Sequence, residues 1–405
     1  MFSRVVHLVR YALPALILAS LIRPRRPIPP LPGSSRILVT RLDGIGDFIL
    51  LAPFLRELRR NYPNSIITLI VGRNAAPLAR PCPYVNEVLM VDLSPTRAAF
   101  SSYSKYLRAV VRHVEGLVKL ANRQLAGRID LAIQPRWDTD VQWATLITFL
   151  SGARRTVGYS EKTSQWKSWS NFGYDRLFKD VLPPGIEQHE AERNLDIIRY
   201  LGGSVESTAP EIWWRQEDQR RADDFMTASG LLGAENVIAF GIGAAKEWCR
   251  WPFYGQLIRL LGQNLTCTPL LLAGPGEEKL VREITALSDG AVVMREMPLG
   301  VVAAALSRCT LFVGNNSGPL HLASAVGLPV IEICAHPMTG ELGHEGHPDR
   351  FGSLASPKVV IRPVDFSGHC KQGCSATTPH CITTIRPEEV ASQVMQLLAS
   401  IKTPA

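Results

Sequence analysis

The sequence predicts an α/β protein of two domains, each built on a parallel β-sheet with helices on both faces. Short apolar runs rich in β-branched residues alternate with amphipathic segments of helical spacing, which is typical of parallel strands joined by crossover helices. The alternation occurs in two sets, separated by a polar stretch at 204–212 that contains Ser, Thr and Pro. The length of 405 residues allows two cores. With 46% hydrophobic and 20% charged residues, the composition is that of a globular protein.

Residues 1–33 are predicted to form a membrane-association segment followed by a spacer. The mainly apolar run Tyr11–Ile22 has arginines on both sides, but it is shorter than the about 20 residues that a spanning helix needs. A signal peptide should end in a cleavage site and not in Arg-Pro-Arg-Arg-Pro. An interfacial helix held against anionic lipid from the cytoplasmic side fits better; a spanning or signal segment and a frayed start remain alternatives. The prolines from Pro24 to Pro32 predict a stiff spacer.

The first domain, residues 34–208, opens with a strand, a glycine turn and a helix. The strand is predicted at Ile37–Val39, the turn carries Gly44 and Gly46, and helical spacing starts at Asp47. Pro53 lies inside this helical pattern, so a kink is expected there. Asp47 is either a helix cap or a carboxylate that faces the ligand cleft at the carboxyl end of a strand. The turn lacks the third glycine of the dinucleotide fingerprint, so a nicotinamide enzyme is not implied.

The rest of the first domain continues the alternation. Further strands are predicted at 66–71, 87–92, 130–133 and 155–159, and helices at 73–80, 97–126, 143–150 and 189–201. Residues 160–188 show little periodicity and are predicted to be a loop near the cleft. Arg136 and Asp138 follow a strand and could face the cleft, although a surface or capping role is favoured for both.

Residues 386–405 are predicted to form a final helical segment with an amphipathic helix at 387–401. The second domain, residues 209–385, repeats the alternation of strands and helices. Its strands are predicted at 237–240, 270–273, 310–314 and 329–333, with helices after the first three. The glycine-rich turn at 241–250 carries Lys246 and Arg250, which makes it a plausible diphosphate cradle.

Two more side chains in this domain are candidates for ligand binding. Glu277 could accept hydrogen bonds from ribose hydroxyls, although an acidic residue in a first helical turn needs no such role. His321 alone would be a weak signal. However, anion-suited strand-to-helix turns occur at 43–47, 241–250 and 314–321, and Pro319 fits the first turn of a helix in the last of them.

Net charge and cysteine content indicate which binding partners, which redox compartment and which metals are expected. The net charge of +8 and the pI of about 9.1 suggest an anionic partner. Nucleic acid is not expected, because the basic residues are dispersed and no matching motif occurs. The eight cysteines are scattered, which suits free thiols in a reducing compartment. His369 to Cys381 could hold zinc, but close Cys-x2-Cys pairs are missing, so no metal is expected.

Several of these motifs, in this order and spacing, resemble glycosyltransferase family 9, the heptosyltransferase-like enzymes of lipopolysaccharide assembly. The resemblance runs from about residue 36 to the end and rests on Thr40–Asp47, Arg155–Tyr159, Trp251-Pro252, Gly314–Ala325 and Cys370, Cys374 and Cys381 ahead of Ile385-Arg-Pro.

The resemblance implies the GT-B fold, with two facing Rossmann-like domains and a last helix that crosses back to the first domain. It implies an inverting glycosyl transfer without metal or other cofactor, from a nucleotide-sugar donor, commonly ADP-heptose. The acceptor would be an anionic lipid-linked saccharide of the lipopolysaccharide core or a related envelope glycan. The enzyme would be cytoplasmic, at the surface of the inner membrane.

By the same resemblance, Asp47 is the general base that deprotonates the acceptor hydroxyl, within the loop of Gly44 and Gly46. Lys246 or Arg250 would neutralise the leaving diphosphate together with N–H groups of residues 317–321, and Glu277 would contact the nucleoside. The donor-binding residues implied are Lys246, Arg250, Glu277, Asn316, Ser317, Gly318 and His321.

The sequence departs from the family pattern at two positions. Asn316 stands where the family usually has an acidic residue, and Cys249 stands where it usually has a lysine. These departures leave the donor sugar and the choice between Lys246 and Arg250 open. They are also the main support for one alternative, a catalytically silent, membrane-attached sugar-binding protein. A separate alternative is an epimerase-like nucleotide-sugar enzyme on the same scaffold, which should need further acidic or histidine groups in the cleft.

Overall fold

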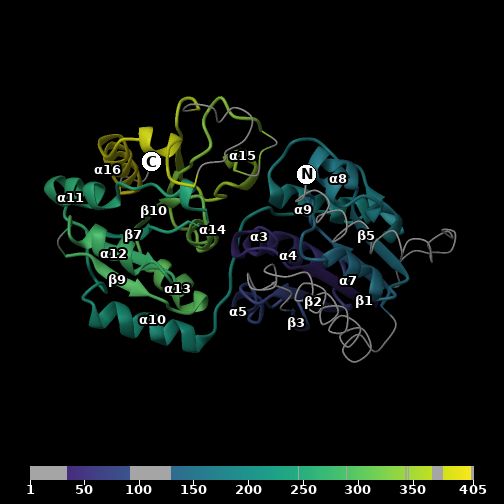
Figure 1. Ribbon diagram of the computed structural model, residues 1–405. Coiled ribbons are helices and arrows are strands. Elements are labelled where there is room, and N and C mark those ends of the chain that lie inside the picture. The colour runs from purple at the N-terminus through teal and green to yellow at the C-terminus, as the bar shows by residue number, and fades with distance from the viewer. Residues whose placement is uncertain are drawn as a thin grey trace, which may run out of the picture. The chain divides into compact units, whose positions relative to one another are not determined.

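The computed structural model describes residues 34–91, 129–244, 246–288, 290–342, 344, 346–366 and 377–402 (Figure 1). The described chain divides into two compact units. The first comprises residues 34–44, 53–186 and 191–208, and the second comprises residues 45–52, 187–190 and 209–402. The short segment 45–52, early in the chain, therefore packs with the second unit.

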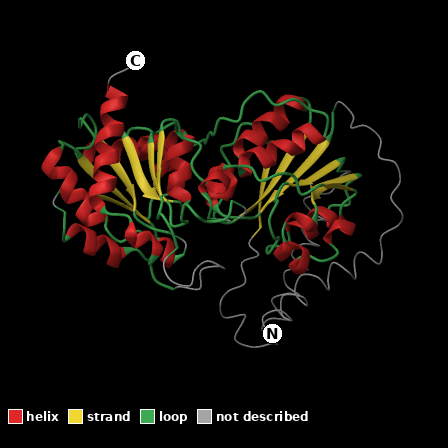
Figure 2. Cartoon of the chain, turned by 90° about the horizontal axis from the view of Figure 1, so that it is seen from above, coloured by secondary structure: helices red, strands yellow, loops and turns green. Residues whose placement is uncertain are grey.

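The first unit contains a six-stranded parallel sheet in the order β3-β2-β1-β4-β5-β6. Its strands are β1 (Arg36–Arg41), β2 (Ile66–Gly72), β3 (Glu87–Val91), β4 (Leu131–Gln134), β5 (Arg155–Tyr159) and β6 (Asp180–Leu182). The central strands are almost fully buried, as expected for a parallel sheet covered on both faces, and Figure 2 shows helices on both sides of it. The predicted strands at 37–39, 66–71, 87–92, 130–133 and 155–159 are confirmed.

The helices of the first unit follow the strands. They are α4 (Ala52–Asn61), α5 (Ala76–Ala79), α7 (Ala144–Leu150), α8 (Gln165–Ser170), α9 (Glu190–Tyr200) and the short 3-10 turns η3 (Glu161–Thr163) and η4 (Tyr174–Leu177). The segment 160–188 is thus not a plain loop. It folds into α8 and supplies β6 as the edge strand beside β5. The predicted helix at 97–126 lies outside the described residues.

The expected kink near Pro53 is a complete break between two helices. Helix α3 (Ile45–Ile49) ends before Leu50, and α4 starts at Ala52. Pro53 is the second residue of α4, a first-turn position where its missing N–H costs no hydrogen bond. The break lets α3 pack with the second unit while α4 stays with the first.

The second unit repeats the architecture with the strand order β12-β11-β10-β7-β8-β9, again all parallel. Its strands are β7 (Val237–Gly241), β8 (Thr268–Ala273), β9 (Val292–Arg295), β10 (Leu311–Asn315), β11 (Val330–Ile333) and β12 (Lys358–Ile361). Its helices besides α3 are α10 (Gln216–Ala228), α11 (Tyr254–Asn264), α12 (Glu278–Thr285), α13 (Leu299–Leu306), α14 (Gly318–Ala325), α15 (Pro348–Phe351), α16 (Pro387–Lys402) and the 3-10 turns η5 (Glu247–Cys249) and η7 (Cys381–Thr384).

The last helix belongs to the second unit. α16 packs on α11 and β12, and Val390, Val394 and Leu398 join the core that also contains Trp251. The expectation that this helix crosses back to the first domain stays a prediction. The apolar stripe of α16 is already buried in its own unit.

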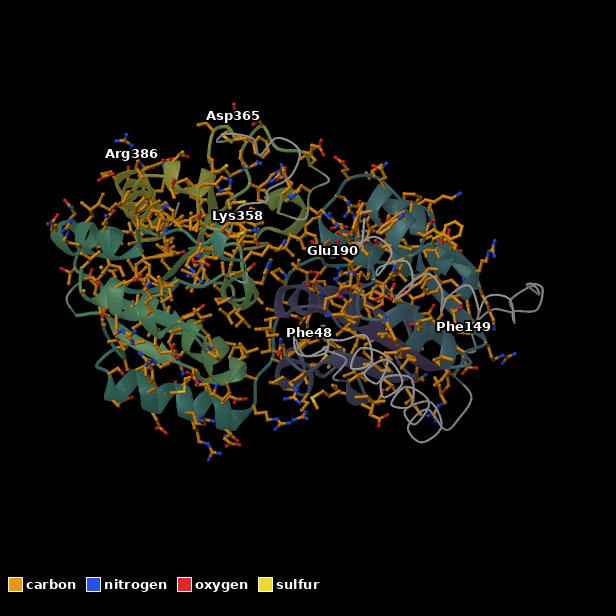
Figure 3. The ribbon with its side chains drawn as sticks, viewed as in Figure 1. Phe48, Phe149, Glu190, Lys358, Asp365 and Arg386 are labelled. Carbon is orange, nitrogen blue, oxygen red and sulfur yellow. The ribbon has the colours of Figure 1, made fainter. Side chains whose placement is uncertain are left out.

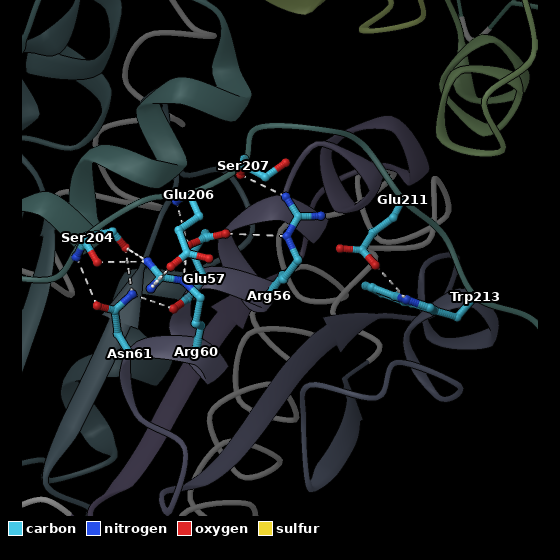
Figure 4. A network of polar contacts seen from close by, with 9 residues as sticks. All are labelled: Arg56, Glu57, Arg60, Asn61, Ser204, Glu206, Ser207, Glu211 and Trp213. Atoms are coloured by element: carbon cyan, nitrogen blue, oxygen red, sulfur yellow. Dashed lines mark hydrogen bonds and ion pairs between the residues drawn. The ribbon is translucent and has the colours of Figure 1, made fainter.

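Residues 204–207, predicted to begin a linker, are fixed on α4. Glu57 is buried, and its carboxylate accepts hydrogen bonds from Arg60 Nε at 2.8 Å and from the Glu206 backbone N–H at 3.1 Å (Figure 4). Burial acts to raise the pKa of Glu57, but these bonds hold it below its ordinary value. Arg56 Nη2 donates to the Ser207 carbonyl at 2.8 Å. The chain thus leaves the first unit along a defined path.

Among the described residues, no helix combines the length and the apolarity that crossing a bilayer requires. The predicted membrane-association segment 1–33 lies outside that part of the chain. The described cysteines are free thiols, as predicted: Cys82, Cys249, Cys267, Cys309, Cys334 and Cys381.

Candidate functional site

The candidate site is built where α3 packs against the amino-terminal turn of α14, in the second unit. Gly46 of α3 lies against the ring of His321: a Cβ on Gly46 would come within 2.7 Å of His321 Cδ2. Ile45 lies beside Gly318, the first residue of α14, at 3.4 Å from the place of a Cβ there. Phe48, labelled in Figure 3, is buried. Only a glycine at position 46 allows this close approach.

Asp47 occupies the first turn of α3 and is partly buried. A carboxylate in a first turn is stabilised by the helix dipole. Asp47 directly follows the glycine that touches His321, so the chain brings the candidate base next to the α3–α14 contact. Gly44, the other predicted loop glycine, is the last residue of the first unit's opening segment.

The start of α14 presents polar groups that the fold itself does not pair. Ser317 is the N-cap residue, but its side chain makes no capping hydrogen bond, and Pro319 stands in the first turn as predicted. The buried Ser317 Oγ and His321 Nδ1 have no hydrogen-bond partner among the described residues. Burial, together with His189, lowers the pKa of His321 to about 3. His321 is therefore a neutral hydrogen-bonding group at pH 7.

Two neighbouring asparagines at the end of β10 have different roles. Asn315 is fully buried: its Oδ1 accepts from the Trp251 N–H at 2.9 Å, and its Nδ2 faces the carbonyls of the β7 loop, with Gly243 O at 3.2 Å. Asn315 therefore fixes the β7 loop. Asn316 is only partly buried and donates through Nδ2 to Glu332 Oε1 at 2.9 Å. Asn315 and Glu332 were both missed as contributors by the sequence analysis.

The two candidate cations differ in environment. Lys246 is exposed, and its Nζ lies 5.5 Å from the centre of the Trp248 ring. Arg250 is partly buried, and its buried Nε has no hydrogen-bond partner among the described residues. Arg250 immediately precedes Trp251, whose N–H is held by Asn315. The arginine is thus anchored at its backbone, whereas the lysine is on an open turn.

Glu277 braces two loops of the site. It is the N-cap residue of α12, and its Oε2 accepts from the Gly274 N–H at 2.8 Å. Its other oxygen lies against Gly243, where a Cβ would be 1.8 Å from Oε1. Holding the β7 and β8 loops together is an evident structural role, and it engages one of the two carboxylate oxygens.

The first unit carries a charged cluster at the carboxyl ends of its strands. Asp43 pairs with Arg41 Nε at 2.6 Å and with Arg136 Nη1 at 2.7 Å. Burial acts to raise the pKa of Asp43, but the two arginines outweigh it and hold the pKa below its ordinary value. Arg136 is partly exposed in this ion pair, and its Nε also donates locally to the Thr139 carbonyl at 2.6 Å. Asp138 does bond locally, accepting from the Thr139 N–H at 2.7 Å.

Metal ligation has no support in the described part of the chain, where no three His, Cys, Asp or Glu side chains are grouped to hold a metal ion. Cys370 and Cys374 lie outside the described residues, and Cys381 is buried at the start of η7.

The fold of the two units indicates the class of protein. Open parallel sheets bind ligands at the carboxyl ends of their strands, and two such doubly wound units in one chain form the GT-B architecture of glycosyltransferases. The chain belongs to glycosyltransferase family 9 (heptosyltransferase), whose family model matches residues 118–341.

Known proteins agree with this assignment. The lipopolysaccharide core heptosyltransferase OpsX of Haemophilus influenzae is 21% identical over 306 residues, which cover 74% of this chain and 79% of that protein. The crystal structure of a family 9 glycosyl transferase from Veillonella parvula matches with a TM-score of 0.73 and 23% identity, over 92% of this chain and 100% of that one. The Escherichia coli ADP-heptose lipopolysaccharide heptosyltransferase II matches with a TM-score of 0.66 and 19% identity, over 91% and 100%. The protein is therefore a glycosyltransferase with the GT-B fold.

Proposed function

We propose that this enzyme transfers a heptose from ADP-heptose to a saccharide of the lipopolysaccharide core or a related envelope glycan. The observation that carries the proposal is the α3–α14 contact, which joins the Asp47 segment to the turn that would receive the donor diphosphate. Similarity to a lipopolysaccharide core heptosyltransferase supports the same sugar and acceptor class.

Asp47 is the general base of the proposed reaction. An alcohol that attacks an anomeric carbon must lose its proton, and a carboxylate is a suitable acceptor for it. A single displacement by the deprotonated hydroxyl inverts the anomeric centre. Asp47→Asn keeps the shape of the side chain but replaces one acceptor oxygen by an NH2 donor and removes the base, so transfer should fall by about 100-fold or more.

The leaving diphosphate is held without a metal ion in this proposal. The N–H groups of Ser317 and Gly318, at the start of α14, favour an anion through hydrogen bonds and the helix dipole. Pro319 has no N–H, and the N–H groups of Leu320 and His321 already donate to the Ser317 carbonyl. Ser317 Oγ and His321 Nδ1 add buried polar groups that lack partners among the described residues. Arg250 supplies the positive charge, because its backbone adjoins Trp251, whose N–H Asn315 holds, and its buried Nε has no hydrogen-bond partner among the described residues. Lys246 is the second candidate.

Attachment to the cytoplasmic side of the inner membrane is proposed for the basic, apolar segment 1–33. The full-length protein should sediment with vesicles that contain phosphatidylglycerol and not with vesicles of phosphatidylcholine alone. Equal binding to both would contradict the electrostatic part of the proposal.

The central experiment compares wild type, Asp47→Asn and Arg250→Ala in the presence of EDTA. Wild type should convert ADP-heptose and a truncated core acceptor to product and ADP, with inversion read by NMR of the new linkage. Asp47→Asn should bind ADP as wild type does but transfer little sugar. Arg250→Ala should bind ADP about 10-fold more weakly. Transfer that survives Asp47→Asn, or that stops in EDTA, would contradict the mechanism.

A further inference from the structure

A buried carboxylate in β11 contacts Asn316, one of the candidate donor-binding residues. Glu332 is in β11, within the strand Val-Ile-Glu-Ile, and its side chain is fully buried. In the register of β10 and β11, Glu332 lies opposite Gly314, two residues before Asn316. A charged group in a buried strand is costly unless it is hydrogen-bonded, so the partners of Glu332 indicate its purpose.

Both oxygens of Glu332 are engaged. Oε2 accepts from the Ser353 backbone N–H at 2.9 Å, and Oε1 accepts from Asn316 Nδ2 at 2.9 Å. Gly352 leaves the room for this, because a Cβ there would be 3.0 Å from Oε2. The backbone N–H can only donate, so Oε2 is fixed as an acceptor whatever happens at the other oxygen.

The bond to Glu332 decides which face of the Asn316 amide is turned outward. An ionised carboxylate only accepts hydrogen bonds, so it admits only the orientation with Nδ2 toward it. The amide oxygen Oδ1 is then directed away from Glu332 and makes no hydrogen bond within the described part of the chain. The site is thereby given an acceptor at position 316, although the residue there is an amide.

We propose that Glu332 is a positioning residue for donor specificity: it orients the Asn316 amide so that Oδ1 accepts a hydrogen bond from a hydroxyl of the donor sugar. This inference rests on the proposed function, since it assumes that Asn316 contacts the sugar of the nucleotide donor. It adds a residue that touches neither the donor nor the acceptor.

Glu332→Gln tests the orientation directly. The Ser353 N–H must still be accepted, so the glutamine oxygen turns to it and the glutamine NH2 turns to Asn316. Asn316 then has to offer Oδ1 inward and Nδ2 outward, which reverses the polarity presented to the sugar. The affinity for ADP-heptose should fall by about 10-fold, whereas the affinity for ADP alone should stay within about threefold of wild type.

Asn316→Asp is the second variant for the same binding experiment. Alone, it places a carboxylate at hydrogen-bond distance from Glu332, and two such groups cannot both ionise without strong repulsion. Binding of ADP-heptose should again weaken by about 10-fold. In the double variant with Glu332→Gln, the glutamine NH2 donates to one oxygen of the new carboxylate, and the other oxygen of that carboxylate faces the sugar. Affinity should return to within about threefold of wild type.

Calorimetric titration with ADP-heptose and with ADP measures all four proteins. It is run at about pH 8, where the Glu332 carboxyl is mostly ionised because its pKa is about 7. Glu57→Gln is the matched control: it neutralises another buried, hydrogen-bonded carboxylate, in the first unit, and should leave both affinities unchanged. If Glu332→Gln binds ADP-heptose as wild type does, or if the double variant is no better than either single one, the inference is wrong. If wild type itself does not prefer ADP-heptose over ADP, the proposed donor is wrong instead.

Discussion

The contact between Gly46 and His321 makes the sharpest structural prediction. In Gly46→Ala, the new Cβ would lie 2.7 Å from His321 Cδ2 and 3.1 Å from Nε2, whereas ordinary contact begins at 3.4 Å. The ring cannot easily turn away, because His321 is only 5% exposed. Helix α3 must therefore shift by about 0.7 Å relative to α14, or His321 must leave its rotamer.

The magnitude follows from two opposing effects on stability and one on catalysis. Overpacking costs about 1–3 kcal/mol, while alanine is favoured over glycine in a helix by up to about 1 kcal/mol. We expect a net loss of about 1–2 kcal/mol in the free energy of unfolding. A displacement approaching 1 Å of a positioned group can cost about 100-fold in rate, so kcat should fall by about 10- to 100-fold.

Urea unfolding and steady-state transfer from ADP-heptose measure both effects. Gly262→Ala in α11 is the control, because a Cβ there meets no atom within 4 Å; it should keep wild-type kcat and lose no stability. A Gly46→Ala protein with wild-type stability and wild-type kcat would refute the close packing of α3 on α14 and, with it, the placement of Asp47 beside the first turn of α14.

Buried polar groups supply three more predictions. Tyr254→Phe removes the 3.1 Å hydrogen bond from Tyr254 Oη to the Gly241 carbonyl and leaves that buried acceptor short of a donor, so urea unfolding should show a loss of about 1–3 kcal/mol. Asp43→Asn removes the carboxylate that pairs with Arg41 and Arg136, which should lower the unfolding free energy at pH 7. Because the pKa of Asp43 is depressed, the wild-type advantage should vanish as pH falls below about 4. Burial raises the pKa of Glu332 to about 7 despite its hydrogen bonds. The free energy of unfolding of wild type should therefore decline as pH rises from about 4.5 to 7, and by more than that of Glu332→Gln. Parallel pH profiles of the two proteins would contradict this.

The interior strands of both sheets were predictable because their residues are mainly apolar. The missed strands β6, β9 and β12 are all sheet edges, where strands are short and only partly buried. Helix α13 was missed for the opposite reason. Its sequence Leu-Gly-Val-Val-Ala-Ala-Ala-Leu is apolar all round, because nearly every residue is buried, so it lacks the stripe that marks a surface helix.

The candidate site was also predictable only in part from the sequence. Its turns could be located from the sequence, since glycines and polar residues after an apolar strand mark the ligand edge of a parallel sheet. The partners of the side chains could not. Nothing local distinguishes Asn315, which fixes the β7 loop, from Asn316, which meets Glu332. That difference depends on which way each side chain leaves the end of β10.

The sequence contained an indication that Glu332 is functional, but assigning residues 329–333 to a strand drew attention away from it. A glutamate between two isoleucines in a strand buried on both faces contradicts the local pattern, and such conflicts concentrate at functional sites. Replacing Glu332 by an apolar residue would suit the strand better, but it would leave the Ser353 N–H and Asn316 Nδ2 facing apolar atoms. The carboxylate is therefore explained by the Asn316 amide that it holds at the end of the neighbouring strand β10. In the proposed function, this bond leaves the amide oxygen of Asn316 to accept from the donor sugar.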